Sequence, residues 1–334
     1  MTSSLVGSEM CIRDRSIPVG LDDDLSAMLL NNDVDPEVPE GTEYYLPAGS
    51  SYRVTPFALM KGFRLAGSRD GVKPIVVLEG SWSIAEGSYL SSLEFDNIEF
   101  RHEANNNYFM NTSKAYTIEN VSFVNCDFIS LRRGFWRHQS ANAKYIMNLE
   151  MEGCRFEGCG WQTSAYGAFN LQSFDKDNGV SYDQVDRAIF RNCTFSNDND
   201  GTNGYGWGNL FYAPYMDKPI DLEYKNVTIY NYSRNQRLIN IESAVGSKLV
   251  MEGILLASPC GDLFAIGANT TTTFSNNYTT ADYTLGGKNM NATDLKITAA
   301  ELFADPANGD LTIKDTSSPI VSNRAGDCLL YTSP

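Results

Sequence analysis

A dense basic cluster lies in the segment LRRGFWRHQ at residues 131–139 of an otherwise acidic chain. Its charged members are Arg132, Arg133, Arg137 and His138. Guanidinium groups bind carboxylates through paired hydrogen bonds, so the cluster is suited to holding the uronate groups of an acidic polysaccharide. Arg137 and His138 are the candidates for a catalytic base, and His138 titrates nearer neutrality. The alternative is that these charges are solvated or paired with nearby aspartates.

Aromatic residues are concentrated in three segments, 131–139, 160–179 and 197–217. Flat aromatic faces can stack on sugar rings, whose C–H faces are apolar. With Arg132 and Arg133, the residues predicted to bind substrate are Trp136, Trp161, Tyr205, Trp207 and Tyr212. The alternative is that these aromatic side chains pack the segments onto the rest of the protein.

Four carboxylates in the same segments are candidate Ca²⁺ ligands, namely Asp175, Asp177, Asp198 and Asp200. A lyase acting on uronates could use Ca²⁺ to neutralise the substrate carboxylate while a base removes the neighbouring proton. The string SNDNDG at 196–201 does not form an EF-hand loop, because it begins with Ser and its twelfth position is Trp207 instead of Glu. Ca²⁺ is the one cofactor that the sequence suggests.

The composition describes an ordinary globular protein of 334 residues, with 42% hydrophobic and 20% charged residues. Its formal net charge of −15 disfavours nucleic acid as a partner, because phosphate would be repelled. No apolar run approaches the roughly 20 residues of a membrane-spanning helix. Away from the ends the cysteines are predicted to be buried free thiols, namely Cys126, Cys154, Cys159, Cys193 and Cys260.

A hexapeptide of the form apolar-x-Asn/Gly-apolar-x-apolar recurs along the chain. Its copies are FDNIEF (95–100), IENVSF (118–123), MEGCRF (151–156), FRNCTF (190–195), YKNVTI (224–229), MEGILL (251–256) and a weaker FSNNYT (274–279). The third positions are Asn97, Asn120, Gly153, Asn192, Asn226, Gly253 and Asn276. Asn and Gly adopt the left-handed backbone most readily, so each copy predicts a sharp bend between two short strands. A fixed bend with variable spacing is typical of a parallel β-helix.

The intervals between these bends are 23, 33, 39, 34, 27 and 23 residues. The longer ones predict loops near 129–147, 157–187 and 196–219, lying side by side on consecutive coils and carrying the candidate site residues. Inward side chains should stack in two files. The first file is Ile98, Val121, Cys154, Cys193, Val227 and Ile254; the second is Phe100, Phe123, Phe156, Phe195, Ile229 and Leu256.

The segments that flank the repeats predict a helix at 21–31, strands at both ends of GTEYYLPAGSSYRV (41–54), and strands at 63–66 and 75–79. Together with FADPANGDLTI near the C-terminus, they resemble the pectin-lyase-like superfamily of single-stranded, right-handed parallel β-helices. Within it, the chain resembles surface β-helix domains of bacterial polysaccharide-utilisation systems. The resemblance implies an all-β solenoid with a capping helix and a short C-terminal helix, exported to the cell surface or beyond.

Both ends resemble translated adapter sequence from metagenomic assembly, and we expect residues 1–15 and 325–334 to be non-native. The expected β-helix domain then covers 16–324, with a cap at 20–40, coils at about 41–280 and a closing segment at 281–324. The true termini would be missing, so an export signal or lipid anchor cannot be sought in the sequence.

Three functions stay open. The preferred one is a monomeric glycan-binding protein whose aromatic and Arg-rich loops hold a polysaccharide. The alternatives are a pectate-like polysaccharide lyase acting on uronates, and a structural or adhesin-like rod. Motifs of the characterised pectate lyases and of the polygalacturonases, such as WxDH and GHG, are absent, which disfavours a hydrolase most.

Overall fold

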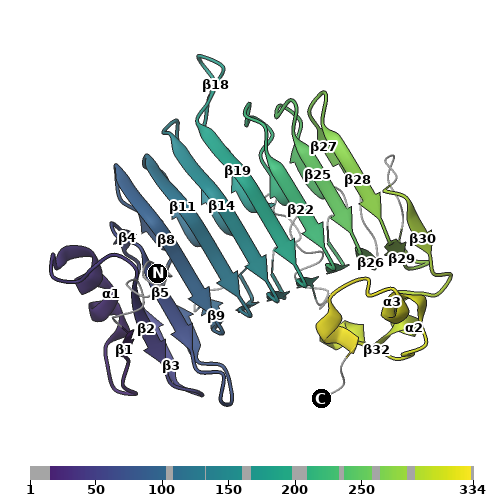
Figure 1. Cartoon of the computed structure of the whole chain (residues 1–334), viewed down its shortest axis with the longest axis horizontal. Coiled ribbons are helices and arrows are strands. Elements are labelled where there is room, and N and C mark those ends of the chain that lie inside the picture. The colour runs from purple at the N-terminus through teal and green to yellow at the C-terminus, as the bar shows by residue number, and fades with distance from the viewer. Residues whose placement is uncertain are drawn as a thin grey trace, which may run out of the picture.

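The computed structural model describes residues 16–102, 108–131, 133–159, 167–197, 209–232, 237–257, 264–283 and 290–331. The chain winds through three parallel sheets, which we name sheets I, II and III, and returns to the same sheet after each coil. Figure 1 shows the long strands of sheet I side by side, with the chain advancing from the purple to the yellow end. The predicted parallel β-helix is therefore confirmed.

Sheets I and II have ten strands each. Sheet I consists of β1 (Ser16–Pro18), β2 (Thr42–Leu46), β5 (Phe63–Gly67), β8 (Ser88–Asp96), β11 (Tyr116–Val124), β14 (Lys144–Glu152), β19 (Asp183–Arg191), β22 (Asp221–Lys225), β25 (Lys248–Glu252) and β28 (Thr271–Ser275). Sheet II consists of β3 (Ser51–Val54), β6 (Ile75–Leu78), β9 (Glu99–His102), β12 (Asp127–Ile129), β15 (Arg155–Glu157), β20 (Thr194–Ser196), β23 (Thr228–Tyr230), β26 (Leu255–Ala257), β29 (Asn277–Thr279) and β30 (Ala292–Asp294).

Sheet III has six strands and closes the third side of the coils. It consists of β10 (Tyr108–Thr112), β13 (Gly134–His138), β16 (Gly167–Leu171), β21 (Asn209–Tyr212), β24 (Ile239–Ile241) and β27 (Phe264–Ile266). The short parallel pair β4 (Ala58–Leu59) and β7 (Ser83–Ile84) occupies the corresponding place in the first coils. Trp82, next to β7, forms a bridge to Met110 of β10, which links the pair to sheet III.

The corner between sheets I and II is formed by single residues with a left-handed backbone. Their φ angles are 56° at Asn97, 50° at Asn125, 63° at Gly153, 50° at Asn192, 53° at Asn226, 68° at Gly253 and 55° at Asn276. Side chains join neighbouring corners where both carry Asn. Asn125 Nδ2 donates to Asn97 Oδ1 (2.6 Å), and Asn226 Nδ2 donates to Asn192 Oδ1 (3.3 Å).

One predicted bend is wrong. Asn120 lies inside β11 with its side chain exposed, and the bend of that coil is Asn125, in the overlapping copy FVNCDF. The hexapeptide pattern occurs twice in this coil, at 118–123 and at 123–128. Only in the later copy do the apolar residues after the Asn, Cys126 and Phe128, lie buried on the sheet II side of the corner. The two intervals around this bend are therefore 28 residues each, instead of 23 and 33.

The inward files are as predicted except in this coil. Phe128 replaces Phe123 in the second file, where the ring centroids of Phe128 and Phe156 are 4.7 Å apart, as are those of Phe156 and Phe195. Cys126 replaces Val121 in the first file beside Cys154, and both are buried free thiols whose pKa is raised by burial. Phe123 and Val121 instead point inward from sheet I.

The solenoid ends differ in how they meet solvent. At the first coil, α1 (Leu25–Val34) packs Leu25 and Leu29 into the core, and it begins after Asp24, whose side chain accepts a hydrogen bond from the Ala27 amide (3.0 Å). The helix is thus shifted from the predicted 21–31. At the last strand of sheet I, Thr272 is exposed in the inward position that Leu249 fills one coil earlier.

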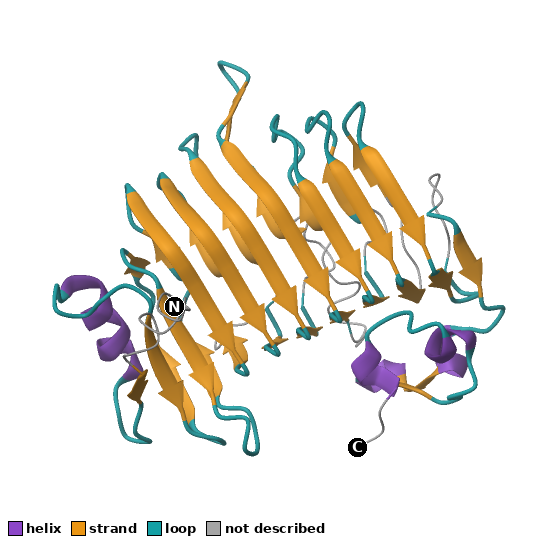
Figure 2. Cartoon of the chain, in the orientation of Figure 1, coloured by secondary structure: helices purple, strands orange, loops and turns teal. Residues whose placement is uncertain are grey.

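The closing segment covers the second half of sheet II (Figure 2). It contains α2 (Ala299–Leu302), β31 (Phe303–Asp305), η1 (Pro306–Asn308), β32 (Asp310–Ile313), α3 (Pro319–Ser322) and η2 (Cys328–Tyr331). Phe303, Leu311 and Ile320 are buried against Tyr230 and Leu255 of sheet II. None of the helices among the described residues is long and apolar enough to span a membrane.

The tail predicted to be non-native is described as far as Tyr331. Its Asp327 accepts a hydrogen bond from the hydroxyl of Thr194 on β20 (2.8 Å), and its Ala325 is buried. The non-native origin of this tail stays a prediction.

Candidate functional site

The three segments predicted as long loops contain strands of sheet III. β13 lies within 129–147, β16 within 157–187 and β21 within 196–219. The prediction missed them because few of their residues are exposed; all five residues of β16 are buried, for example, so no alternation of buried and exposed residues marks this strand. Of the described candidates, Trp136, Arg137 and His138 therefore lie on β13, and Tyr212 lies on β21.

A row of polar side chains runs across sheet III. Asn111, Arg137, Asn170, Tyr212 and Asn240 occupy paired positions on the consecutive strands β10, β13, β16, β21 and β24. We call these five residues the polar row. Asn111, Arg137 and Tyr212 are partly exposed, whereas Asn170 and Asn240 are buried. The parallel register thus places a hydrogen-bonding or stacking group at every strand spacing of about 4.8 Å.

Two arginines of the basic cluster meet at one aromatic ring. The guanidinium carbon of Arg137 lies 5.2 Å from the ring centroid of Tyr108, and that of Arg133 lies 5.9 Å from it. Arg137 also donates from Nη1 to the Tyr108 hydroxyl (3.2 Å). These contacts hold two cations near one aromatic ring. The structure therefore places Arg133 and Arg137 near the same ring, and their role in substrate binding stays a prediction.

Tyr212 lies near a second aromatic group on the same side. The rings of Phe174 and Tyr215 are stacked, with centroids 4.3 Å apart, and Tyr215 is 36% exposed. Phe174 begins the small hairpin of β17 (Phe174–Asp175) and β18 (Val180–Ser181). The pKa of Tyr212 is raised by burial first, and then by Tyr215 and the carboxylate of Glu242.

Trp136 does not lie on the surface. Its side chain is fully buried, and its indole Nε1 donates to the hydroxyl of the buried Tyr116 (3.2 Å). A ring with no exposed face cannot stack on a sugar, so the prediction of substrate binding conflicts with this position. Trp136 follows the inward Phe135, and it fills the core near the corner between sheets III and I.

His138 is also buried, at the end of β13. Its Nδ1 lies 2.6 Å from Asp183 Oδ1, and its Nε2 lies 2.6 Å from the Tyr116 hydroxyl. Because the carboxylate accepts, Nδ1 carries the proton, and Nε2 accepts the hydrogen bond that Tyr116 donates. Burial lowers the pKa of His138, an effect that Asp183 partly opposes. The predicted role as a catalytic base conflicts with this burial, since no substrate can reach the ring.

The same corner holds a buried lysine. Lys144 Nζ donates to Ser173 Oγ (2.7 Å) and to the carbonyl oxygens of Asn142 (2.8 Å) and Ser140 (3.2 Å). The second carboxylate oxygen of Asp183 accepts from the Ser173 amide (2.6 Å), which closes the network. Burial lowers the pKa of Lys144 to about 8.

This buried network of Asp183, His138, Tyr116, Lys144 and Ser173 was missed by sequence reasoning. One signal was present: Lys144 and Asp183 open two nine-residue strands of sheet I and are direct partners in them. Because His138 follows Arg137 directly, the network fixes the end of the strand that carries the arginine. The network therefore supports Arg137 of the polar row from the core side of the sheet, and none of its residues belongs to the row.

Two of the predicted Ca²⁺ ligands, Asp175 and Asp177, belong to the described residues, and they do not form a metal site there. The Asp175 carboxylate accepts hydrogen bonds from the Asp177 amide (2.9 Å) and from the Asn178 amide and side chain (3.1 and 2.7 Å), which lowers its pKa. Asp175 thus closes the tip of the hairpin. In the described part of the chain, no three His, Cys, Asp or Glu side chains form a group that could hold a metal ion.

Several candidates fall outside the described residues. They are Arg132, Trp161, Tyr205 and Trp207 of the predicted substrate surface, Asp198 and Asp200 of the predicted Ca²⁺ site, and Cys260. In the sequence, each of these residues stands between a strand of sheet II and the following strand of sheet III. Their roles stay predictions.

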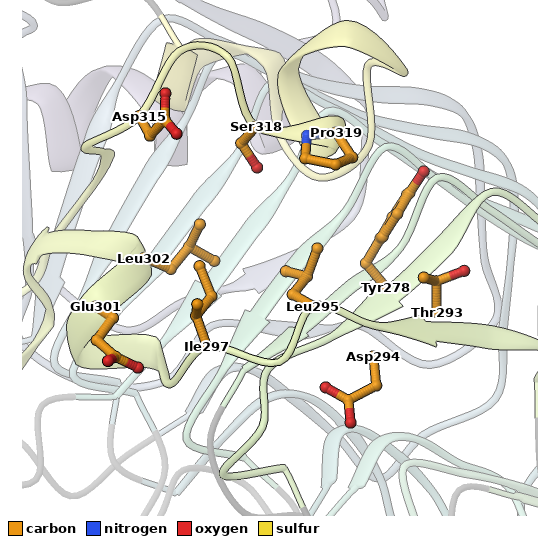
Figure 3. A pocket seen from close by; sticks show the side chains of 10 residues that line it. All are labelled: Tyr278, Thr293, Asp294, Leu295, Ile297, Glu301, Leu302, Asp315, Ser318 and Pro319. Carbon is orange, nitrogen blue, oxygen red and sulfur yellow. The ribbon is translucent and has the colours of Figure 1, made fainter.

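A pocket of about 260 Å³ lies at the far end, between β29, β30 and the closing segment (Figure 3). Leu295, Ile297 and Leu302 lie in its centre, with the carboxylates of Asp294, Glu301 and Asp315 around them. Each carboxylate accepts hydrogen bonds from a residue two or three positions away, namely Lys296, Thr298 and Ser317. No residue predicted for the site lines this pocket.

Comparison with known proteins adds no identification. No protein-family model matches the chain, and a search of curated proteins finds no significant match.

Proposed function

We propose that this protein binds an acidic polysaccharide along the outer face of sheet III. The observation that carries the proposal is the polar row, with Arg133 and Arg137 held against Tyr108 at one end. Paired guanidinium groups are suited to uronate carboxylates, and the partly exposed Tyr212 is suited to a sugar face. Because the row crosses one strand per position, the polysaccharide would lie along the solenoid axis.

We also propose that the protein belongs to the pectin-lyase-like superfamily and is exported. Corners built from Asn in successive coils, a capping helix and a closing segment support membership of the pectin-lyase-like superfamily, with export to the cell surface or the medium. We further propose that the protein acts as a monomer. A uronate lyase is the alternative function, in which Arg137, the predicted catalytic residue that is partly exposed, would contact the substrate.

The test is binding of polygalacturonate, alginate and hyaluronate to the chain, with and without Ca²⁺. Affinity electrophoresis measures binding, and absorbance at the unsaturated-uronate band measures lyase action. Arg137→Ala should weaken binding of the preferred uronan by about ten- to a hundredfold, because a charged hydrogen bond contributes about 1.5–3 kcal/mol.

Arg101→Ala is the matched control, since Arg101 is an exposed strand arginine on sheet II that pairs with Glu99. It removes the same charge away from the polar row and should leave binding unchanged. Equal losses in both variants, or no binding of any uronan, would overturn the proposal. New absorbance that disappears in Arg137→Ala would replace binding by lyase action as the function of the same face.

A further inference from the structure

The outer face of sheet I carries two tyrosines in equivalent positions. Tyr89 on β8 is paired with Thr117 on β11, which is paired with Tyr145 on β14. We call these three residues the tyrosine strip. Tyr89 is 56% exposed and Tyr145 is partly exposed. No described helix or strand crosses this part of the face in Figure 1, so a ligand can approach it.

Hydrogen bonds hold both rings across the sheet. The Tyr89 hydroxyl donates to Oε1 of Glu119 on β11, and the Tyr145 hydroxyl donates to Oδ2 of Asp186 on β19. Each carboxylate lies two residues beyond the position paired with its tyrosine, on the next strand. Both side chains therefore reach over the neighbouring strand in the same direction, and both are accessible to solvent.

The spacing of the rings suggests what they bind. Neighbouring strands lie about 4.8 Å apart, so two equivalent side chains with one strand between them are about 9.6 Å apart along the solenoid axis. An extended β-linked pyranose chain with twofold symmetry turns the same sugar face in one direction at every second unit, and that repeat is close to two strand spacings. Two tyrosine faces can thus stack under alternate sugars of one chain.

The charges beside the strip point to an uncharged ligand. Besides Glu119 and Asp186, the carboxylate of Glu40 lies here, accepting from the amide and the hydroxyl of Ser91 (2.6 and 2.9 Å). Carboxylates accept hydrogen bonds from sugar hydroxyls but repel uronates. We propose that the tyrosine strip is a second glycan site, which binds an extended, neutral β-linked polysaccharide and is independent of the polar row.

The experiment uses the full chain with soluble cellohexaose, mannohexaose and xylohexaose, and isothermal titration calorimetry measures affinity. Tyr89→Ala and Tyr145→Ala should each weaken binding of the preferred hexasaccharide by about tenfold. Tyr89→Phe should keep most of the affinity, because it retains the ring. Tyr45→Ala is the matched control, since Tyr45 is a 39% exposed tyrosine of β2 on the same sheet, outside the strip.

Absence of hexasaccharide binding, unchanged binding in the Tyr89→Ala, Tyr145→Ala double variant, or an equal loss in Tyr45→Ala would overturn the proposal. Thermal unfolding of each variant shows that the fold is intact, which the exposure of Tyr89 leads us to expect. Polygalacturonate binding is measured on the same samples. Failure of the tyrosine strip then appears as a loss of neutral-glycan binding, and failure of the polar row as a loss of uronate binding.

Discussion

Sheets III and I belong to the same coils, yet their outer faces carry opposite chemistry. On sheet III, guanidinium groups lie against the ring of Tyr108. On sheet I, the tyrosine hydroxyls of the strip are tied to carboxylates. The backbone gives both faces the same strand spacing, and the side chains make one face basic and the other acidic. These coils thus present two outer faces with the same strand spacing and opposite charge.

The largest effect is expected at the buried network that connects the two sheets. Asp183→Ala would remove the hydrogen-bond acceptor of the buried His138 and a carboxylate that favours the charged form of the buried Lys144. Removal of one partner from a buried ionic group costs about 3–5 kcal/mol, so urea unfolding should show a loss of this size. Because His138 adjoins Arg137, uronate binding should weaken more than neutral-glycan binding does.

Asp186→Ala is the control for this change, because Asp186 is an exposed aspartate on the same strand. Its free energy of unfolding should fall by less than about 1 kcal/mol. Similar losses in the two variants would contradict the prediction that the buried carboxylate of Asp183 contributes more to stability than an exposed carboxylate on the same strand.

A smaller effect is expected from pH. Burial lowers the pKa of His138, so the folded protein keeps this ring neutral at pH values where the unfolded chain protonates it. Below the ordinary histidine pKa of about 6.5, the unfolded state therefore binds more protons. The free energy of unfolding should fall as the pH drops from 7 to 5, by at most about 1.4 kcal/mol per unit from this group.

Urea unfolding of the wild type and of His138→Gln at both pH values isolates this contribution, since the other titrating groups are common to both. The variant should lose less stability on acidification. Identical pH dependence in the two proteins would contradict a neutral, buried His138.

The smallest effect is expected from salt, and it compares the two faces directly. Uronate binding at Arg133 and Arg137 should weaken by several-fold between 50 and about 500 mM NaCl, because salt screens exposed charges. Neutral-glycan binding at Tyr89 and Tyr145 should change by less than about twofold, because stacking carries no net charge. If the affinities for both ligands depended equally on salt, the proposal that one face binds its ligand through charge and the other through stacking would be contradicted.

The fold could be predicted from the sequence where the backbone conformation restricts the residue type. Only Asn or Gly tolerates the corner between sheets I and II without strain, so the corners at Asn97, Gly153, Asn192 and Asn226 were predicted correctly. The error at Asn120 arose where two overlapping copies satisfied the same pattern. Burial, which the pattern does not encode, decided between them.

The site was predicted less well, for a physical reason. Trp136 and His138 occur among charged residues in the sequence, yet on β13 both are buried, while Arg137 between them is partly exposed. Whether such a side chain points to the core or to solvent depends on the sheet that packs behind it. The network partner Asp183 is 45 residues away from His138, a separation that no local motif reports.

Thr272 has a consequence for the protein in concentrated solution. A parallel β-helix is a template for its own growth, because the last strand offers a free edge to any similar strand. Another copy docking on β28 would meet Thr272 where the preceding coil presents Leu249, and would bury a hydroxyl group in place of an apolar side chain. One polar residue at the terminal rung thus disfavours end-to-end polymerisation.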